Sequence, residues 1–141
     1  RYTPHQHAVV PAEFSPGMEP LPDLDGLPVV VCGLHSQIAP AAAAARAARP
    51  DARVAYVHTD AGALAVAFSD LVRRLRDAGL IDVTLSSGQA FGADLECVAL
   101  PSALQAARTL ARADVVLVAQ GPGNAGTGTA LGFSGIEQGW N

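Results

Sequence analysis

The chain alternates between short apolar runs and longer segments with helical periodicity. The clearest run, VVLVA at 115–119, contains no polar residue and is typical of a strand buried on both faces of a sheet. Shorter runs of the same kind lie at 28–32, 53–57 and 83–85, and 96–100 is a candidate for a fifth. Strands that alternate with helices in this way predict a mostly parallel sheet of four to five strands.

The segments between these strands predict three helices, at 39–49, 62–78 and 102–113. The second is the best supported, because its apolar side chains share one face at helical spacing: Leu64, Phe68, Leu71, Val72 and Leu75. Short right-handed crossovers place such helices on both faces of a sheet. We therefore predict an α/β fold, a three-layer Rossmann-like sandwich.

Residues 1–27 differ from the rest of the chain, because they are rich in proline and show little periodicity. We interpret them as a proline-rich arm or the remnant of an upstream domain, with a short strand over 7–13. Residues 28–141 are predicted to form the Rossmann-like domain, with a last helix beginning over 129–133. The start at Arg1 and the abrupt C-terminal end suggest a fragment that is truncated there.

A glycine-rich loop follows the run at 115–119. Residues 121–126, GPGNAG, match the G-x-G-x-x-G pattern that cradles a pyrophosphate in dinucleotide-binding domains. That pattern normally opens its βαβ unit, whereas this one follows the last strand, and Pro122 has no backbone N–H to offer. A P-loop is excluded, because Thr127 stands where its lysine belongs and the chain has no lysine at all. The loop is either a ligand-binding loop or a tight turn that binds nothing.

Composition narrows the classes of function. A chain of 141 residues fits one domain, and half of its residues are hydrophobic. The net charge of −4 and the scattered arginines argue against a nucleic-acid partner. No apolar run approaches the roughly 18 residues that span a membrane, so we expect a cytoplasmic protein with no membrane contact. Cys32 and Cys97 have no metal-binding spacing and are predicted to be inert core residues.

Polar residues collect where the predicted strands end. Ligands of open parallel sheets bind beyond the carboxyl ends of the strands, so we expect these residues to meet at one edge. The residues predicted to bind a ligand there are Ser36, Gln37, Thr59, Gln89, Gln120, Gly121, Gly123, Asn124, Gly126, Thr127 and Thr129.

Three residues of the same loops are candidates for catalysis: His35, His58 and Asp60. Imidazoles suit proton transfer near neutral pH or, together with a carboxylate, metal binding. The alternative is that each histidine is hydrogen-bonded at a strand end and that Asp60 caps the helix at 62–78. Ser36 lacks the G-x-S-x-G elbow and Ser134 breaks it at the fifth position, so no motif supports acyl transfer. The pattern identifies neither a metal site nor a cofactor.

Several motifs together resemble a domain-of-unknown-function family of Gram-positive bacteria, over nearly all of the chain. Members of that family look longer, with material on both sides, and the resemblance implies no established activity or catalytic residue. Ala61 and Ala93 stand where the family pattern has glycine. The motifs are YTP at 2–4, LHSQ at 34–37, TDAGAL at 59–64, GQAFGADLE at 88–96, QGPG at 120–123, GTGT at 126–129 and GFSG at 132–135.

Three hypotheses for function remain. The first is a Rossmann-like domain that binds a small anionic or nucleotide-like ligand at the carboxyl edge of its sheet, with its cofactor and reaction unknown. The second is a non-catalytic scaffold or a homo-oligomerisation domain whose glycines only turn the chain. The third and weakest is a metal-dependent hydrolase that uses the two histidines and Asp60.

Overall fold

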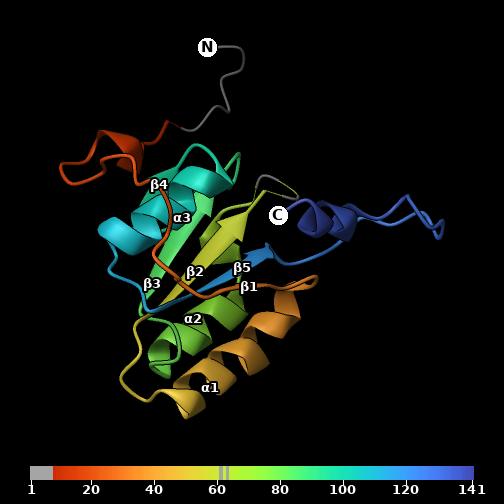
Figure 1. The fold of residues 1–141 in the computed structure, drawn as a ribbon. Helices are drawn as coiled ribbons and strands as arrows, with labels where there is room; N and C mark the ends of the chain where they lie inside the picture. The colour runs from red at the N-terminus through yellow and green to blue at the C-terminus, as the bar shows by residue number, and fades with distance from the viewer. Residues whose placement is uncertain (1–7, 61, 63) are drawn as a thin grey trace.

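The computed structural model describes residues 8–60, 62 and 64–141. The motif predicted at 2–4 and two positions of the 59–64 motif, 61 and 63, therefore lie outside the described residues. The helices are α1 (Ile38–Ala48), α2 (Asp70–Asp77) and α3 (Leu100–Thr109), with short 3-10 helices η1 (Ala12–Phe14), η2 (His35–Gln37), η3 (Val66–Phe68) and η4 (Ser134–Gly139). The strands are β1 (Val29–Val31), β2 (Val54–Thr59), β3 (Val83–Ser87), β4 (Leu95–Cys97) and β5 (Val115–Gln120) (Figure 1).

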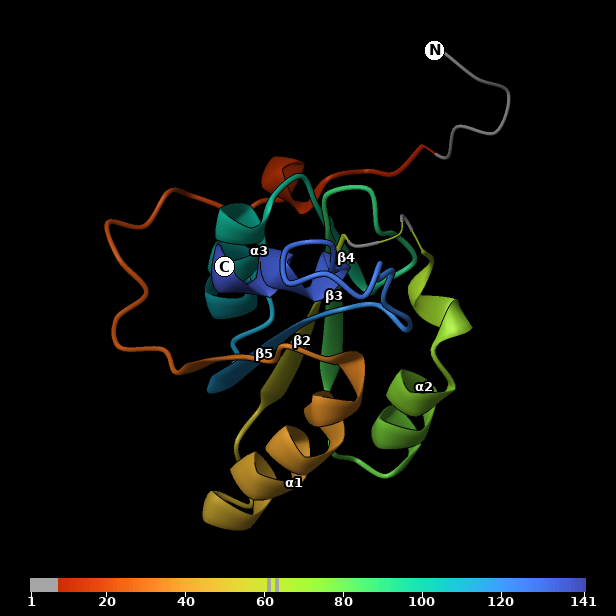
Figure 2. The same ribbon diagram turned by 90° about the vertical axis from the view of Figure 1, so that its right-hand side faces the viewer.

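The five strands form one sheet in the order β1-β5-β2-β3-β4, and every pairing is parallel. Helices α1 and α2 cover one face, and α3 covers the other (Figure 2). The predicted α/β fold with a parallel sheet is confirmed, including the fifth strand that the sequence left open. Because β5 inserts between β1 and β2, the last strand of the chain occupies the centre of the sheet.

Alternating side chains of the central strands pack into two separate hydrophobic cores, one on each face of the sheet. Tyr56 of β2 and Leu117 of β5 pack against α1 and α2, whereas Val57 and Val116 face α3. All four side chains are fully buried. Helices α1 and α3 pack closely on these strands because their inner faces are largely alanine, which adds little bulk between helix and sheet, whereas α2 contributes leucine and valine.

Strand β1 is less buried than its sequence predicts. The run at 28–32 is apolar throughout, yet Val30 and Val31 keep 41% and 40% of their surface exposed. The strand order explains the difference, because β1 pairs only with β5 and forms one edge of the sheet. An apolar run marks a strand but not its place in the strand order, so this prediction of a buried strand was wrong.

Three predicted element bounds also need correction. The helix predicted at 62–78 begins only at Asp70, because the extended backbone and capping hydroxyl of Ser69 start a new helix there. The described part of the strand predicted at 7–13 contains η1 instead. The helix predicted from 129–133 is absent, since the segment belongs to a hairpin closed by a bridge between Gly126 and Phe133.

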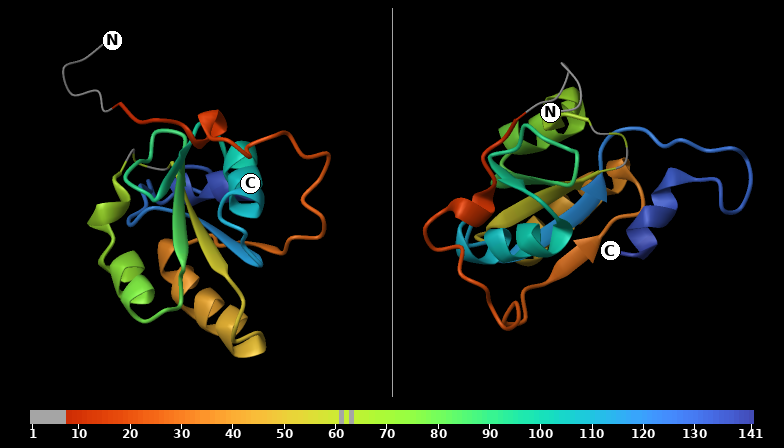
Figure 3. Two further views of the ribbon diagram at one scale, coloured as in Figure 1. Left: turned by 90° about the vertical axis from the view of Figure 1, so that its left-hand side faces the viewer. Right: turned by 90° about the horizontal axis from the view of Figure 1, so that it is seen from above.

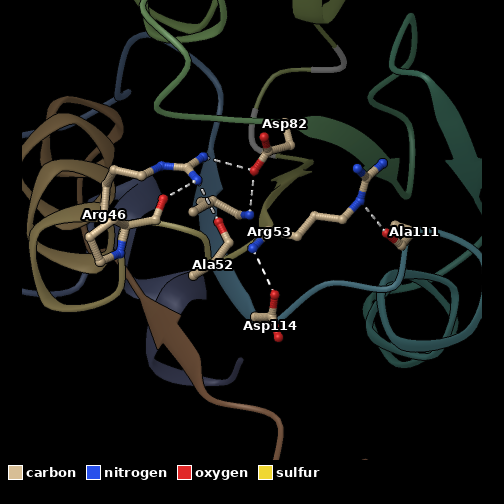
Figure 4. A network of polar contacts seen from close by, with 8 residues as sticks. Arg46, Ala52, Arg53, Asp82, Ala111 and Asp114 are labelled. Carbon is tan, nitrogen blue, oxygen red and sulfur yellow. Dashed lines mark hydrogen bonds and ion pairs between the residues drawn. The ribbon is translucent and has the colours of Figure 1, made fainter.

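The amino edge of the sheet is held by two carboxylates that accept backbone N–H groups (Figure 4). Asp82 accepts from the backbone of Val54 at 2.6 Å and pairs with Arg46 at 2.9 Å. Asp114 accepts from the backbone of Arg53 at 2.7 Å. These contacts fix the start of β2 against both of its neighbours and occupy several arginines at the edge opposite the predicted site.

The described part of the proline-rich arm, 8–27, packs on α3 (Figure 3). Ala12 is 3% exposed within the core on that face, and Met18 and Leu27 pack against the same core. The Glu13 carboxylate accepts from the backbone of Val98 at 2.7 Å, and Arg108 of α3 pairs with Asp25 at 2.7 Å. The arm thus buries part of the domain's own apolar surface.

Candidate functional site

The carboxyl ends of β1, β5 and β2 lie side by side, and the chain leaves them toward opposite faces of the sheet. After β1 and β2 it continues to α1 and α2, whereas after β5 it leads to η4 on the face of α3 (Figures 2 and 3). Gln138 of η4 anchors this arrangement by donating to Thr59 Oγ1 at 3.0 Å. Such a change of direction between neighbouring strands opens a crevice at the sheet edge, where ligands of parallel α/β sheets bind.

Two hollows occupy this place, and we call them together the edge crevice. The larger, about 260 Å³, lies over β1 and β5, and the smaller, about 20 Å³, lies over β2 and β5. Both are bordered by Pro122 and Gly123 of the loop that follows β5. The larger is otherwise lined by Leu34, His35, Ser36, Leu71 and Asn124, and the smaller by His58, Gly62, Leu64 and Gly121.

His58 is buried beneath the glycine loop. It is 1% exposed, and a Cβ built on Gly121 would stand 2.4 Å from its Nε2 atom. Burial, together with the neighbouring His35, lowers the pKa of His58 to about 4, although Asp60 opposes the change. The ring is therefore neutral at physiological pH. Its Nδ1 atom is buried and has no hydrogen-bond partner among the described residues.

His35 is held from both sides, and its partners fix its tautomer. Its Nδ1 atom lies 2.9 Å from the carbonyl oxygen of Gln120, so Nδ1 carries the proton and donates. Its Nε2 atom lies 2.6 Å from Ser69 Oγ, and in the neutral ring it accepts the proton of that hydroxyl. Burial lowers the pKa of His35, which keeps this neutral form, although the bond to Gln120 acts in the opposite direction.

No pattern in the sequence selects Ser69 or Tyr56 as a site residue. Ser69 is 34 positions from His35 in the chain. Its one local signal is that it precedes a helix, but the predicted helix began at residue 62 and not after Ser69. Tyr56 lay in an apolar run that predicted only a strand. Its ring packs edge-on against His58 with centroids 5.8 Å apart, and its hydroxyl donates to the Ala119 carbonyl at 3.2 Å. Burial raises the pKa of this phenol, so it stays protonated.

Asp60 lies at the end of β2 and does not cap α2. That helix begins ten residues later and is capped by Ser69, whose Oγ accepts from Val72 N–H at 3.0 Å. The Asp60 carboxylate accepts instead from the backbone of Gln89 at 3.2 Å, which joins the β2 loop to the β3 loop. In the part of the chain that the structure describes, no three histidine, cysteine or acidic side chains gather as metal ligands would.

The predicted ligand-binding residues fall into two groups. Ser36, Gly121, Gly123 and Asn124 border the edge crevice. Three polar side chains around it are engaged with the protein: Gln37 Oε1 accepts from the backbone of Leu34, Thr59 accepts from Gln138, and Gln120 donates to Asn124. Gln89 donates its backbone N–H to Asp60. The side-chain oxygen of Gln120, Oε1, is buried and has no hydrogen-bond partner among the described residues.

The second group lies in the hairpin that follows the loop. Thr127 N–H donates to the Gly132 carbonyl at 2.8 Å, and Thr129 hydrogen-bonds Thr127 through the two hydroxyls at 2.9 Å. Gly126 pairs with Phe133, and the N–H groups of Gly132 and Ser134 donate to carbonyls of the same hairpin. The hairpin therefore uses backbone donors that a phosphate cradle would need to direct at its ligand.

The charge near the edge crevice is acidic. Burial raises the pKa of the Glu137 carboxyl of η4, and the negative charge of Asp60 raises it further, so these two side chains lie in one electrostatic neighbourhood. The arginines in ion pairs lie elsewhere, with partners Asp82, Asp114, Asp70, Asp94 and Asp25.

The sequence model described as "Protein of unknown function (DUF3866)" matches residues 1–141. The chain belongs to this family. No curated protein and no solved structure matches it. Membership in DUF3866 confirms the resemblance to a domain-of-unknown-function family, while the expected Gram-positive source and longer parent protein stay predictions. No helix in the described part of the DUF3866 chain is long and apolar enough to cross a membrane.

Proposed function

We propose that this domain binds a small nucleotide-like molecule in the edge crevice. One observation carries the proposal: β5 sends the chain to the face opposite that of β1 and β2, and the two hollows lie at those junctions. In open parallel sheets this is where ligands are held, because loops on both sides can contact them. We also propose a cytoplasmic location, which is the location that the sequence suggested.

The polar groups around the crevice support a ligand that forms hydrogen bonds. His58 Nδ1 and Gln120 Oε1 are buried near the carboxyl edge without partners among the described residues. An unpaired buried polar group costs about 1–3 kcal/mol, which a ligand or an ordered water recovers. The smaller hollow has the volume of about one water molecule, so a bound ligand reaches His58 through water or through one small polar group.

The surrounding charge favours the nucleoside part of such a ligand over its phosphates. The carboxylates of Asp60 and Glu137 repel an anionic ligand. Backbone N–H groups of the hairpin donate within the hairpin and not to such a ligand. A nucleotide-like ligand therefore fits the crevice better than a small anion. We propose that its base and sugar lie in the crevice and that any phosphate is directed to solvent.

A panel of adenosine, guanosine, cytidine, uridine and their 5′-phosphates tests the proposal by thermal shift and by amide chemical shifts of Gly121 and Gly123. A ligand at 100 times its dissociation constant stabilises the fold by about 2.7 kcal/mol. We expect at least one nucleoside to bind, and Asn124→Ala to weaken it about tenfold. Thr129→Ala, in the hairpin, is the matched control and should leave binding unchanged. No response to any compound of the panel would contradict the proposal.

The exposed edge of β1 favours the second hypothesis, a homo-oligomerisation scaffold. An edge strand offers unpaired backbone groups, and Val30 and Val31 are about two-fifths exposed. Sedimentation equilibrium tests this hypothesis with Val30→Lys as the disrupting variant. A monomer at every concentration would remove it. The metal-dependent hydrolase gains no support from the described residues.

A further inference from the structure

A serine and a histidine form a hydrogen-bonded pair that the proposed ligand does not require. Ser69 Oγ lies 2.6 Å from His35 Nε2, and the two residues are 3% and 9% exposed. Because His35 Nδ1–H donates to the Gln120 carbonyl, the lone pair of Nε2 faces the hydroxyl. This is the resting arrangement of a nucleophile and its general base, with a main-chain carbonyl orienting the imidazole.

The start of α2 supplies backbone donors beside the same hydroxyl. Ser69 is the residue before the helix, and its Oγ accepts from Val72 N–H. The N–H groups of Asp70 and Leu71 open the helix, where the helix itself has no acceptor for them. Such amides stabilise negative charge that develops on an oxygen next to the nucleophile, and the helix dipole adds to the effect.

A hollow of about 350 Å³ lies on the side of Ser69 away from the edge crevice. Its apolar wall includes Val66 and Val72, which suits a short acyl chain. Asp77 also lines the hollow, with Arg73 and Arg76, which are paired with Asp70 and Asp94. A guanidinium group binds a carboxylate with two parallel hydrogen bonds. Because the Arg73–Asp70 pair is exposed and weak, a substrate carboxylate can replace Asp70 as the partner of Arg73.

We propose that Ser69 and His35 form an acyl-transfer site for short esters or thioesters that carry a carboxylate. Ser69 Oγ bonds to the acyl carbon, its proton passes to His35 Nε2, and the carbonyl π electrons move to the oxygen. Collapse of this adduct breaks the bond to the alcohol or thiol, which leaves with the proton from His35. Water then attacks the acyl-serine, His35 accepts its proton and returns it to Ser69, and the carboxylic acid is released.

A purely structural role predicts a different result. Ser69 caps α2, and His35 joins that cap to β5, so both side chains also stabilise the fold. Ser69→Ala removes the cap and the nucleophile together. Ser69→Asn keeps a capping oxygen and removes only the nucleophile, because asparagine is a good residue at this helix position.

Two serine-directed probes test the site. The first, p-nitrophenyl hydrogen succinate, acylates the serine and is followed by release of p-nitrophenolate, and the second, a short-chain fluorophosphonate, phosphonylates it with loss of fluoride and is followed by mass spectrometry. Trypsin releases residues 54–73, in which Ser69 is the only serine, so an adduct is assigned without ambiguity. We expect both reactions at Ser69, with a loss of about 100-fold or more in Ser69→Asn and His35→Gln. Ser15→Ala, which changes a serine of the arm at the end of η1, should react like the wild type.

The pH profile separates a general base from a structural histidine. Acylation should persist below the ordinary histidine pKa of 6.5 and fall only as His35 becomes protonated, because burial lowers the pKa of that ring. Absence of both adducts on 54–73 in folded protein would overturn the proposal. So would hydrolysis that Ser69→Asn retains. His35 borders both sites, so Ser69→Asn is the variant that separates this proposal from nucleoside binding, because Ser69 and its hollow take no part in that binding.

Discussion

The ring of His58 lies directly against the Cα of Gly121: a Cβ built there would stand 2.4 Å from Nε2 and 2.8 Å from Cε1. The first glycine after β5 is thus required by a side chain of the neighbouring strand, and not by backbone conformation. The edge crevice is shaped by this contact, because it lets the 121–123 loop lie close over β2.

Gly121→Ala should destabilise the protein by about 1–3 kcal/mol, because a methyl group at this position displaces the buried ring of His58. Urea unfolding measures the change. Gly139→Ala is the matched control, since a Cβ there meets no atom within 4 Å. Combining Gly121→Ala with His58→Ala should cost less than the sum of the single changes. Additive losses would show that the two residues do not interact.

Acidification should destabilise the protein through His58. Its pKa is about 4 when folded and 6.5 when unfolded, so the unfolded chain binds more protons between these values. The stabilisation from neutral His58 is complete above pH 6.5 and is lost as the pH falls toward 4. The loss of stability reaches about 2 kcal/mol by pH 5. Urea unfolding at pH 7.5, 6 and 5 measures the loss. His58→Gln should flatten this dependence, and an unchanged slope in that variant would assign it to other groups.

Asp94→Ala should destabilise the protein by about 1–3 kcal/mol, because it leaves a backbone N–H of β3 without its acceptor. The Asp94 carboxylate accepts from Thr84 N–H at 2.8 Å and from its hydroxyl at 3.0 Å, and it pairs with Arg76. Asp70→Ala is the control, since its ion pair with Arg73 is exposed and should contribute below about 1 kcal/mol. Equal effects in thermal denaturation would contradict the assigned role of Asp94.

Ala12→Asp should destabilise the domain by about 3 kcal/mol or more, because it places an unpaired carboxylate in the core beneath α3. Ala8→Asp, at an exposed position of the same arm, should have little effect. Circular dichroism melts compare the two variants. If Ala12→Asp melts like the wild type, the arm is separable from the domain, as expected for the remnant of an upstream domain.

The sequence by itself determined the fold class and the edge at which polar residues gather. Continuous apolar runs such as 115–119 leave few options besides a covered parallel sheet, and parallel strands bring all their carboxyl ends to one side. Placing His35, His58, Ser36 and Asn124 near one edge follows from that topology alone. Helix periodicity was less decisive, because Ser69 interrupts the segment 62–78 with a cap that competes with helix continuation.

Only the tertiary structure decided which residues meet. The insertion of β5 between β1 and β2 exposes β1, creates the edge crevice and brings the Gln120 carbonyl to His35. The pairing of His35 with Ser69 crosses from the β1 loop to the start of α2, and no local pattern encodes it. Likewise, the glycine-rich stretch divides into a loop over His58 and a self-paired hairpin. Strand order and hydrogen-bond partners depend on contacts between distant segments, whereas periodicity records only what each segment buries.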